Sequence, residues 1–345
     1  MTASTLTVAV LAGGRSSEHD VSLSSAAAVR DGLRAGGHEV VWVEIGRDGA
    51  WRRDGEGEPL ATTPGGGLLG VDVVFPVLHG RFGEDGTVQG MLEMLDAPYV
   101  GSGVAASALC MDKVLFKELM AASGTIPQVG YVDVREQTLA GAGRQELLEQ
   151  AMQLGLPVFV KPSHLGSSVG IVKVTTESEL VAAIESAFAY DERVIVEAAA
   201  SGIEVECGVL GNLAAERAQA AEPAVASTPG EIVFEGDFYD FDAKYAAGGM
   251  ELLVPARISA QAAARVRELA LEAFARAGCD GLARVDFFVD GEHVLVNELN
   301  TMPGFTPTSV YAKLLAASGV EYAELVDRLC RLGIERHAAV GEQAF

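Results

Sequence analysis

The sequence predicts an α/β protein composed of three units. These are an N-terminal α/β unit with a parallel sheet at residues 1–112 and two α+β units at residues 113–202 and 203–345. Strand-like and helix-like segments alternate along the first unit, a breaker at residues 124–127 follows it, and small residues at 198–202 indicate a hinge. At 345 residues the chain is long enough for two or three domains, each with its own core.

The elements of the first unit follow from apolar spacing and glycine positions. Residues 8–11 are apolar, precede two glycines and predict a strand, and the spacing at 21–33 predicts a helix that ends before Gly36-Gly37. Further strands are predicted at 40–45 and 71–78, and a helix at 87–95. Ligands bind beyond the carboxyl ends of parallel strands, and Glu18 and His79 both follow strands. They are therefore candidate binding residues.

The second and third units are predicted in the same way. Helical spacing occurs at 113–123, 145–154 and 177–189, and residues 129–197 form a small α/β unit. The last unit has strands at 204–210, 231–234 and 250–254, then a long helix at 259–277, a hairpin, and helices near 309–317 and 322–332.

Composition excludes several classes of function. A formal net charge of −23 argues against sequence-independent nucleic-acid binding, which needs a basic surface. No apolar segment has membrane-spanning length, and the N-terminus has no basic segment followed by an apolar one. The four cysteines, which form no Cys-x-x-Cys pair, are Cys110, Cys207, Cys279 and Cys330. This scattering predicts buried, reduced thiols without zinc or disulfides, and therefore a cytoplasmic protein.

The hairpin around Asp290-Gly291 carries the strongest chemical pattern. If paired positions sum to an even number, the even-numbered polar residues share one face, and odd-numbered apolar residues cover the other. The polar face would hold Arg284, Asp286, Glu298 and Asn300, and the apolar face Val285, Phe287, Leu295 and Leu299. Two carboxylates and an amide oxygen suit Mg²⁺ that also carries phosphate oxygens. The alternative is a solvated face with ordinary salt bridges.

A second pattern, "VKPSHLGSSVGI", supports the phosphate interpretation. Lys161 ends an apolar strand, and Gly166, Ser167 and Ser168 follow in a loop. Backbone amides, small hydroxyls and a lysine on a flexible loop can hold a triphosphate. The segment is not a Walker loop, because no Gly-Lys-Ser/Thr opens a helix. Alone it would be a plain turn; with the downstream acid hairpin it predicts a nucleotide site.

With these motifs in place, the chain resembles the ATP-grasp ligases and, within them, the D-alanine–D-alanine ligases. The resemblance covers essentially the whole chain and rests on six ordered motifs: "VAVLAGGRSSEHDVSL", "VLHGRFGEDG", "MDK", "KPSHLGSSVG", "FYDFDAKY" and "NELNTMPGFTPTS". It implies an ATP-grasp fold, in which two α+β subdomains sandwich ATP. It also implies ligation of two D-alanines through a D-alanyl phosphate, for peptidoglycan precursor synthesis.

The resemblance assigns the nucleotide and metal residues. ATP would be bound by Lys113, Lys161, Ser168, Glu197, Ala199, Ala200, Glu204 and Lys244. Two Mg²⁺ (or Mn²⁺) ions would be held by Asp286, Glu298 and Asn300. Family members often carry a bulky aromatic residue where this chain has Ala199, which implies a thinner wall of the adenine pocket. Solvated charges are the alternative for each lysine and for Glu197 and Glu204.

The remaining implied residues concern the two amino acids. Glu18 would bind the ammonium group of the first D-alanine and His79 its carboxylate, although helix capping and a satisfied core histidine are the alternatives. Capping is the preferred interpretation only for Asp20. Arg284 and the amide of Gly304 would stabilise the oxyanion, and Ser309 would bind the second D-alanine. Ser167 and Tyr245 would complete a hydrogen-bonded set under a lid at residues 238–249, whose alternative is a surface loop.

Three other functions compete with this assignment. Another ATP-grasp carboxylate–amine ligase would share the hairpin and lysines, but it is disfavoured by the combination of Glu18, Ser167, Tyr245 and Ser309. A non-catalytic nucleotide-binding regulator would lack a metal ligand or Arg284, and neither is missing. A dehydrogenase would need a Gly-x-Gly-x-x-Gly spacing that Gly13-Gly14 lacks. The expected partners are therefore D-alanine and ATP, without nucleic acid or membrane, in a homodimer.

Overall fold

The computed structural model describes residues 4–166, 169–213, 223–234 and 250–341, and its described strands form three sheets. The first sheet has the order β3-β2-β1-β4, with β1 parallel to β2 and β4 and with β3 antiparallel at one edge. Its strands and helices are β1 (Thr7–Gly13), α1 (His19–Ala35), β2 (Glu39–Ile45), β3 (Trp51–Arg53), β4 (Val73–Pro76), α2 (Thr87–Leu95) and α3 (Val104–Met111). The predicted parallel sheet is confirmed; β3 and α3 were not predicted.

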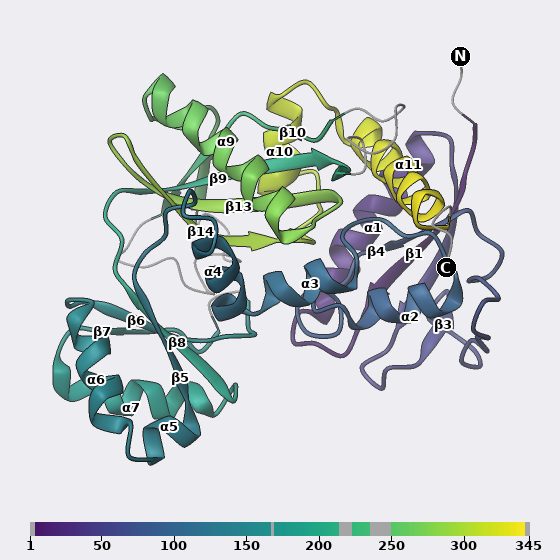
Figure 1. The fold of residues 1–345 in the computed structure, drawn as a ribbon. Helices are drawn as coiled ribbons and strands as arrows, with labels where there is room; N and C mark the ends of the chain where they lie inside the picture. The colour runs from purple at the N-terminus through teal and green to yellow at the C-terminus, as the bar shows by residue number, and fades with distance from the viewer. Residues whose placement is uncertain (1–3, 167–168, 214–222, 235–249, 342–345) are drawn as a thin grey trace.

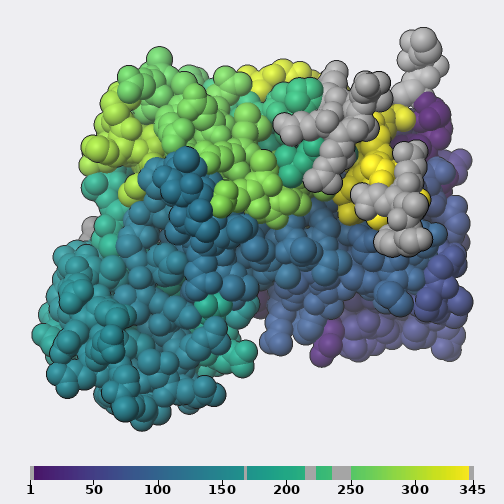
Figure 2. Space-filling view, viewed as in Figure 1, coloured from purple at the N-terminus to yellow at the C-terminus, as the bar shows by residue number. Residues whose placement is uncertain are grey.

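The central unit contains a four-stranded antiparallel sheet of order β5-β8-β6-β7. Its elements are β5 (Tyr131–Arg135), α5 (Glu136–Ala140), α6 (Arg144–Gln153), β6 (Val158–Pro162), β7 (Val172–Val174), α7 (Glu177–Phe188) and β8 (Arg193–Ala198). The helix α7 begins with a capping box between Thr176 and Glu179, as its sequence favours. In Figure 1 this unit lies at the lower left, and Figure 2 shows a notch between it and the N-terminal unit.

The third sheet is the largest and has the order β12-β11-β9-β13-β14, with β10 also paired to β9. Its elements are β9 (Ile203–Gly211), β10 (Val225–Ala226), β11 (Gly230–Phe234), β12 (Met250–Leu253), α9 (Ala260–Ala277), β13 (Gly281–Asp290) and β14 (His293–Asn300). The helices α10 (Val310–Ala317) and α11 (Tyr322–Gly341) end the described chain. In Figure 1, α9 lies along one side of this sheet.

The two faces of the large sheet have different roles. Odd-numbered residues such as Val205, Val285 and Phe287 are buried in one core with α9. On the opposite face, Tyr311 and Leu315 of α10 pack so closely over Gly208 that a Cβ there would lie 2.7 Å from the Leu315 side chain. The remaining end of this face, where the even-numbered polar residues lie, is therefore left for a site.

Packing crosses the three sequence units. The helix α4 (Lys113–Ala121) contributes Phe116 and Met120 to the core under α9, whereas the central sheet has a separate core. Near the other end of the chain, α11 packs against α1, and its Leu325 and Leu329 belong to the core of the N-terminal sheet. The proposed boundaries thus separate the sheets but not the helices that pack on them.

The hairpin β13–β14 contains a bulge that determines which side chains reach the site. A two-residue turn pairs Asp290 with His293, so paired positions near the turn sum to an odd number. A register shift then makes Asn297 the extra residue on β14, and Asp286 pairs with Glu298. The prediction that Leu295 faces the core is therefore wrong: it pairs with Phe288 on the opposite face. Val294 and Val296 fill the core instead, at 4% and 0% exposure.

Candidate active site

The bulged hairpin brings its polar residues together as predicted. Nε and Nη2 of Arg284 each donate a 2.7 Å hydrogen bond to the Asp286 carboxylate. Across the strand, Asn300 Nδ2 donates to Asp286 Oδ2 at 3.1 Å, and Glu298 lies directly opposite Asp286. All four side chains therefore share one face, as strand alternation requires.

A third carboxylate, Glu206, was missed by the sequence analysis. It lies on β9 directly opposite Asp286, and its Oε2 is 2.9 Å from Arg284 Nε. Burial alone would lower the pKa of Arg284, but Asp286 and Glu206 outweigh it and raise that pKa well above the ordinary value. The signal was present in the alternation of Glu204 and Glu206, which places both on the same face of β9.

The hairpin residues fit a hard divalent cation. Among the described residues no group of three or more His, Cys, Asp and Glu side chains has a metal-binding arrangement. The predicted set is of another kind, with two carboxylates and one amide, and those oxygen donors suit Mg²⁺ together with phosphate oxygens. The Asp286 oxygens accept hydrogen bonds from Arg284 and Asn300, so these contacts would have to adjust for Asp286 to bind a cation.

Lys113 connects the hairpin to the predicted phosphate loop. Its Nζ donates a 2.6 Å hydrogen bond to the carbonyl of Leu165, immediately before Gly166, and lies 3.8 Å from Glu298 Oε2. Lys161, at the end of β6, has its Nζ 2.5 Å from Glu197 Oε2. Burial opposes the charge of Lys161, but Glu197 outweighs it and raises the lysine pKa. Both predicted lysines therefore lie at the junction of the central and large sheets.

A cavity of about 380 Å³ opens beside Lys161 and lies between these two sheets. Phe159 and Lys161 line it from β6, Glu197 and Ala200 from β8 and the hinge, and Glu204 from β9. The apolar part of the wall consists of Ile203, Ile232, Val233, Phe234 and Phe288. Apolar walls with a few polar groups are typical of ligand sites of this volume. The neighbouring Ala199 donates its backbone N–H to the carbonyl of Pro157 and is not among the lining residues.

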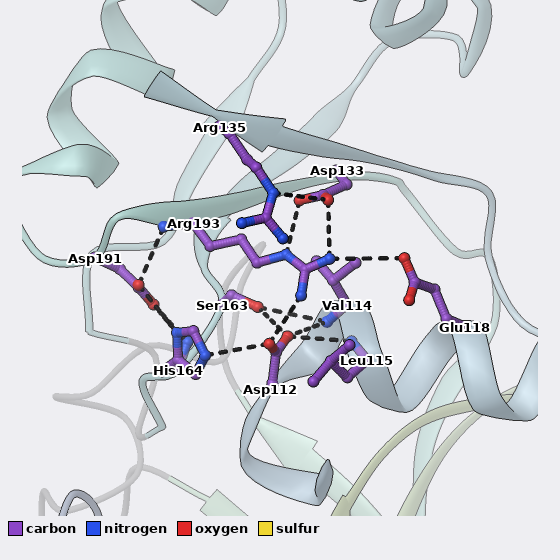
Figure 3. Close-up of polar contacts among 10 residues, drawn as sticks. All are labelled: Asp112, Val114, Leu115, Glu118, Asp133, Arg135, Ser163, His164, Asp191 and Arg193. Atoms are coloured by element: carbon purple, nitrogen blue, oxygen red, sulfur yellow. Dashed lines mark hydrogen bonds and ion pairs between the residues drawn. The ribbon is translucent and has the colours of Figure 1, made fainter. Parts of the chain in front are cut away.

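A polar cluster anchors both lysine-bearing segments (Figure 3). Asp112 caps α4 by accepting from the N–H groups of Val114 and Leu115 at 2.9 and 3.1 Å. Its carboxylate also accepts from Ser163 Oγ at 2.6 Å and from Arg193 Nη1 at 2.9 Å. The cluster therefore connects the helix that carries Lys113 to the strand end that carries Lys161. The motif "MDK" alone does not indicate this role for Asp112.

Glu18 and His79 lie together at the carboxyl ends of β1 and β4. Glu18 is the N-cap residue of α1, but its side chain makes no capping hydrogen bond, so capping does not explain it. His79 is buried, with Nε2 3.1 Å from Ser25 Oγ and Nδ1 3.3 Å from the Met302 carbonyl. This geometry supports the satisfied-histidine alternative, and a substrate contact of His79 stays a prediction. Asp20 lies in the first turn of α1, as capping predicts, and pairs with Arg47 at the surface.

Glu84 is a further residue that the sequence analysis missed. Its Oε2 accepts a 2.6 Å hydrogen bond from the Gly80 N–H. Burial, reinforced by Glu18, raises the pKa of Glu84 to about 8. A protonated Glu84 adds no second negative charge beside the Glu18 carboxylate. The motif "HGRFGEDG" contained this residue, but the sequence alone could not indicate its burial.

The segment after β14 places two more predicted residues side by side. A Cβ on Gly304 would lie 3.3 Å from Ser309 Oγ. That hydroxyl accepts from the Thr306 N–H at 3.0 Å and lies 2.8 Å from Thr306 Oγ1. Four predicted residues, Ser167, Ser168, Lys244 and Tyr245, lie outside the described residues.

Several known proteins are similar to this chain in sequence and in fold. Family profiles described as "D-ala D-ala ligase N-terminus" and "D-ala D-ala ligase C-terminus" match residues 7–67 with 60–102 and residues 119–331. A D-alanine–D-alanine ligase of Heliobacterium modesticaldum is 45% identical, covering 96% of this chain and 95% of that protein. The Coxiella burnetii D-alanine–D-alanine ligase structure matches with a TM-score of 0.83 at 35% identity, covering 99% of this chain and 97% of that one. The VanG D-Ala:D-Ser ligase of Enterococcus faecalis matches with a TM-score of 0.82 at 34% identity, covering 96% and 100%.

The fold and the site together define an ATP-grasp ligase, with a cavity between two sheets, lysines on one side and an acid hairpin on the other. The chain belongs to the D-alanine–D-alanine ligase family.

Proposed function

We propose that this enzyme joins two D-alanines into D-alanyl-D-alanine at the expense of ATP, by way of a D-alanyl phosphate, and so supplies a peptidoglycan precursor. The observation that carries the proposal is the position of Lys113, whose ammonium contacts both the carbonyl of Leu165 and Glu298. This position supports the proposal, because phosphoryl transfer would need a phosphate-binding lysine beside the acid hairpin.

ATP would lie in the cavity beside Lys161. Lys113, Lys161, Ser168 and Lys244 would bind its phosphates, and Glu197, Ala199, Ala200 and Glu204 would surround the adenosine. Support comes from the lining of the cavity by Glu197, Ala200 and Glu204. A carboxylate is a natural acceptor for ribose hydroxyls. Asp286, Glu298 and Asn300 would hold two Mg²⁺ or Mn²⁺ ions, which when bound would neutralise phosphate charge.

The reaction needs two bond exchanges. The carboxylate of the first D-alanine, with its ammonium on Glu18 and its carboxylate near His79, attacks the γ-phosphorus of ATP and releases ADP. The amine of the second D-alanine then attacks the acyl carbon, loses a proton, and phosphate leaves. Arg284 and the Gly304 N–H would stabilise the oxyanion of the tetrahedral species, which exists after the amine attacks and before phosphate leaves. Support comes from the position of Arg284. Among the described residues its Nε and Nη2 atoms contact Asp286 and Glu206, which holds the guanidinium on the polar face of the hairpin.

The second substrate would be bound by Ser309, with Lys244, under a lid in which Ser167 and Tyr245 join Glu18. The match to a D-Ala:D-Ser ligase makes D-serine the alternative second substrate. Phosphate release from ATP is the test, measured with D-alanine alone and with D-alanine plus D-serine, D-lactate or L-alanine. Release with D-alanine alone, together with a D-alanyl-D-alanine product, supports the proposal, and no release with any D-amino acid contradicts it.

We also propose that the enzyme acts as a homodimer in the cytoplasm. Large apolar side chains are exposed on the neighbouring helices α2 and α3, with Met94 at 65% and Val104 at 41% exposure, which supports a subunit contact. The four free cysteines are all buried, and in the described residues no helix is long and apolar enough to cross a membrane. Light scattering in solution tests the dimer.

A further inference from the structure

Lys117 is a fully buried lysine that the proposed reaction does not use. It lies on α4 one turn after Lys113, so the two side chains point to the same side of the helix. Its side chain is only 1% exposed, and lysine is almost never buried to this degree unless it is paired. Asp112 caps the start of the same helix (Figure 3), and the Lys117 carbonyl accepts a 3.0 Å hydrogen bond from Gln128 Nε2.

The partner of Lys117 is the carboxylate of Glu197. Lys117 Nζ lies 3.1 Å from Glu197 Oε1, and Lys161 Nζ lies 2.5 Å from Glu197 Oε2. Among the described residues Lys117 Nζ makes no hydrogen bond of good geometry, so the contact is an ion pair. Burial alone would raise the pKa of Glu197, but the two ammonium groups outweigh burial and lower it to about 2. One buried carboxylate is therefore shared between two lysines.

The three side chains carry a net charge of +1, and the position of that charge matters for the nucleotide. Lys161 and Glu197 line the cavity, whereas Lys117 is not among the lining residues. Without Lys117, the Glu197 carboxylate would neutralise Lys161, and the phosphates of ATP would lose the attraction of that lysine. With Lys117 present, Glu197 keeps a counter-charge when Lys161 turns toward a phosphate.

We propose that Lys117 is a positioning residue for nucleotide binding, which pairs with Glu197 and thereby leaves the charge of Lys161 available to the phosphates of ATP. This inference rests on the proposed contact between Lys161 and ATP. A purely structural role, in which Lys117 only neutralises a buried acid, predicts a loss of stability without selectivity between nucleotides and nucleosides.

The experiment measures the binding of MgATP and of adenosine by calorimetry, together with thermal unfolding, for Lys117→Met. Lys313→Met on the exposed side of α10 is the matched control, because it removes the same charge from a helix surface. We expect Lys117→Met to weaken MgATP binding by about tenfold or more, the scale of the single Lys161 charge that Glu197 would then neutralise in a partly buried site. Adenosine binding should change by less than about threefold, because adenosine has no phosphate charge for Lys161 to attract. An equal loss for both ligands, or no loss, overturns the proposal.

The double variant Lys117→Met/Glu197→Gln separates action through Glu197 from direct contact. If Lys117 acts through Glu197, removing the leftover carboxylate frees Lys161, and the double variant should bind MgATP more tightly than Lys117→Met alone. If the double variant binds no better, the proposal is wrong. Should Lys117→Met fail to fold, Glu197→Gln and the double variant are compared directly. Their MgATP affinities should agree within about threefold, since Glu197→Gln leaves Lys117 no carboxylate to neutralise. Weaker binding by the double variant than this would indicate that Lys117 contacts the nucleotide directly, and would overturn the proposal.

Lys161→Met distinguishes failure of the inference from failure of its premise. If this variant binds MgATP as well as the unmodified enzyme, Lys161 does not contact the phosphates. Both the proposed phosphate contact and the role of Lys117 then fall. If Lys161→Met weakens MgATP binding while Lys117→Met does not, only the role of Lys117 is wrong.

Discussion

Nε2 of His164 lies 3.2 Å from Asp112 Oδ2, at the residue that caps the helix carrying Lys113. The other ring nitrogen, Nδ1, lies 2.9 Å from Asp191 Oδ2. A neutral imidazole has one N–H, so carboxylates at both nitrogens require the imidazolium form. The hydrogen bonds to Asp112 and Asp191 outweigh burial and raise the pKa of His164 to about 9. A charged histidine thus connects the N-terminus of α4 to the segment just before β8 (Figure 3).

The first prediction concerns the pH dependence of this junction. The pKa of His164 is raised above its ordinary value of 6.5, so its stabilising contribution is fully present below pH 6.5 and is lost as pH rises through about 9. His164→Gln should therefore lower the free energy of unfolding at pH 6 and remove this part of the alkaline loss. His164→Arg, which stays charged, should lose less stability than the unmodified enzyme above pH 9. Urea unfolding across pH 6 to 10 checks this, with exposed His293→Gln as the control; identical profiles for all variants would refute it.

The second prediction concerns Glu84. Its pKa is raised to about 8 from an ordinary 4.5, so its contribution to stability is fully present below pH 4.5 and is lost as pH rises from there to about 8. Glu84→Gln keeps an acceptor for the Gly80 N–H but cannot ionise. We expect the variant and the unmodified enzyme to be similarly stable near pH 4.5, and the variant to be more stable at pH 6 and, by a larger margin, at pH 9. Because His164 titrates over a neighbouring range with the same sign, unfolding of the double variant with His164→Arg should show the two effects adding. A stability difference that does not change with pH would contradict the assigned role of Glu84.

Most elements and the shared polar face of the hairpin could be predicted from the sequence, but the contacts that depend on burial could not. Alternation alone places Arg284 with Asp286 on one face of β13 and Glu298 with Asn300 on one face of β14. The even sum that would align the two pairs does not hold at the turn, where Asp290 pairs with His293. The bulge at Asn297 was not visible, because a bulge depends on the strand that pairs alongside. The importance of Lys117 and Glu84 likewise arises from burial against distant segments, Glu197 in one case and Glu18 in the other. Pattern and turn chemistry specify faces, whereas tertiary packing determines pairing.

The third prediction concerns the proposed oxyanion contact of Arg284. Arg284→Met should slow ligation by about a hundredfold or more, the scale for removing one oxyanion contact. It should also destabilise the fold, by about 3–5 kcal/mol, because Asp286 and Glu206 lose the cation between them. Arg284→Lys retains the charge and should recover stability more than rate, because a lysine cannot reproduce the planar donor pair. Rate, MgATP affinity and unfolding are measured together; collapse of MgATP binding with an intact fold would make Arg284 a phosphate ligand instead.

The last prediction concerns the cation site on the bulged hairpin. Glu298→Gln keeps the size of the side chain and removes its charge, so ligation should be abolished if Asp286, Glu298 and Asn300 hold the metal ions. Stability should change little, because Glu298 is partly exposed and its contact with Lys113 is a long 3.8 Å ion pair. The matched control is Glu292→Gln at the exposed turn of the same hairpin, which should leave the rate unchanged. Titration of Mn²⁺ by electron paramagnetic resonance, in the presence of ATP, reports ion binding independently of turnover. Near-normal turnover and Mn²⁺ binding by Glu298→Gln would remove Glu298 from the cation site.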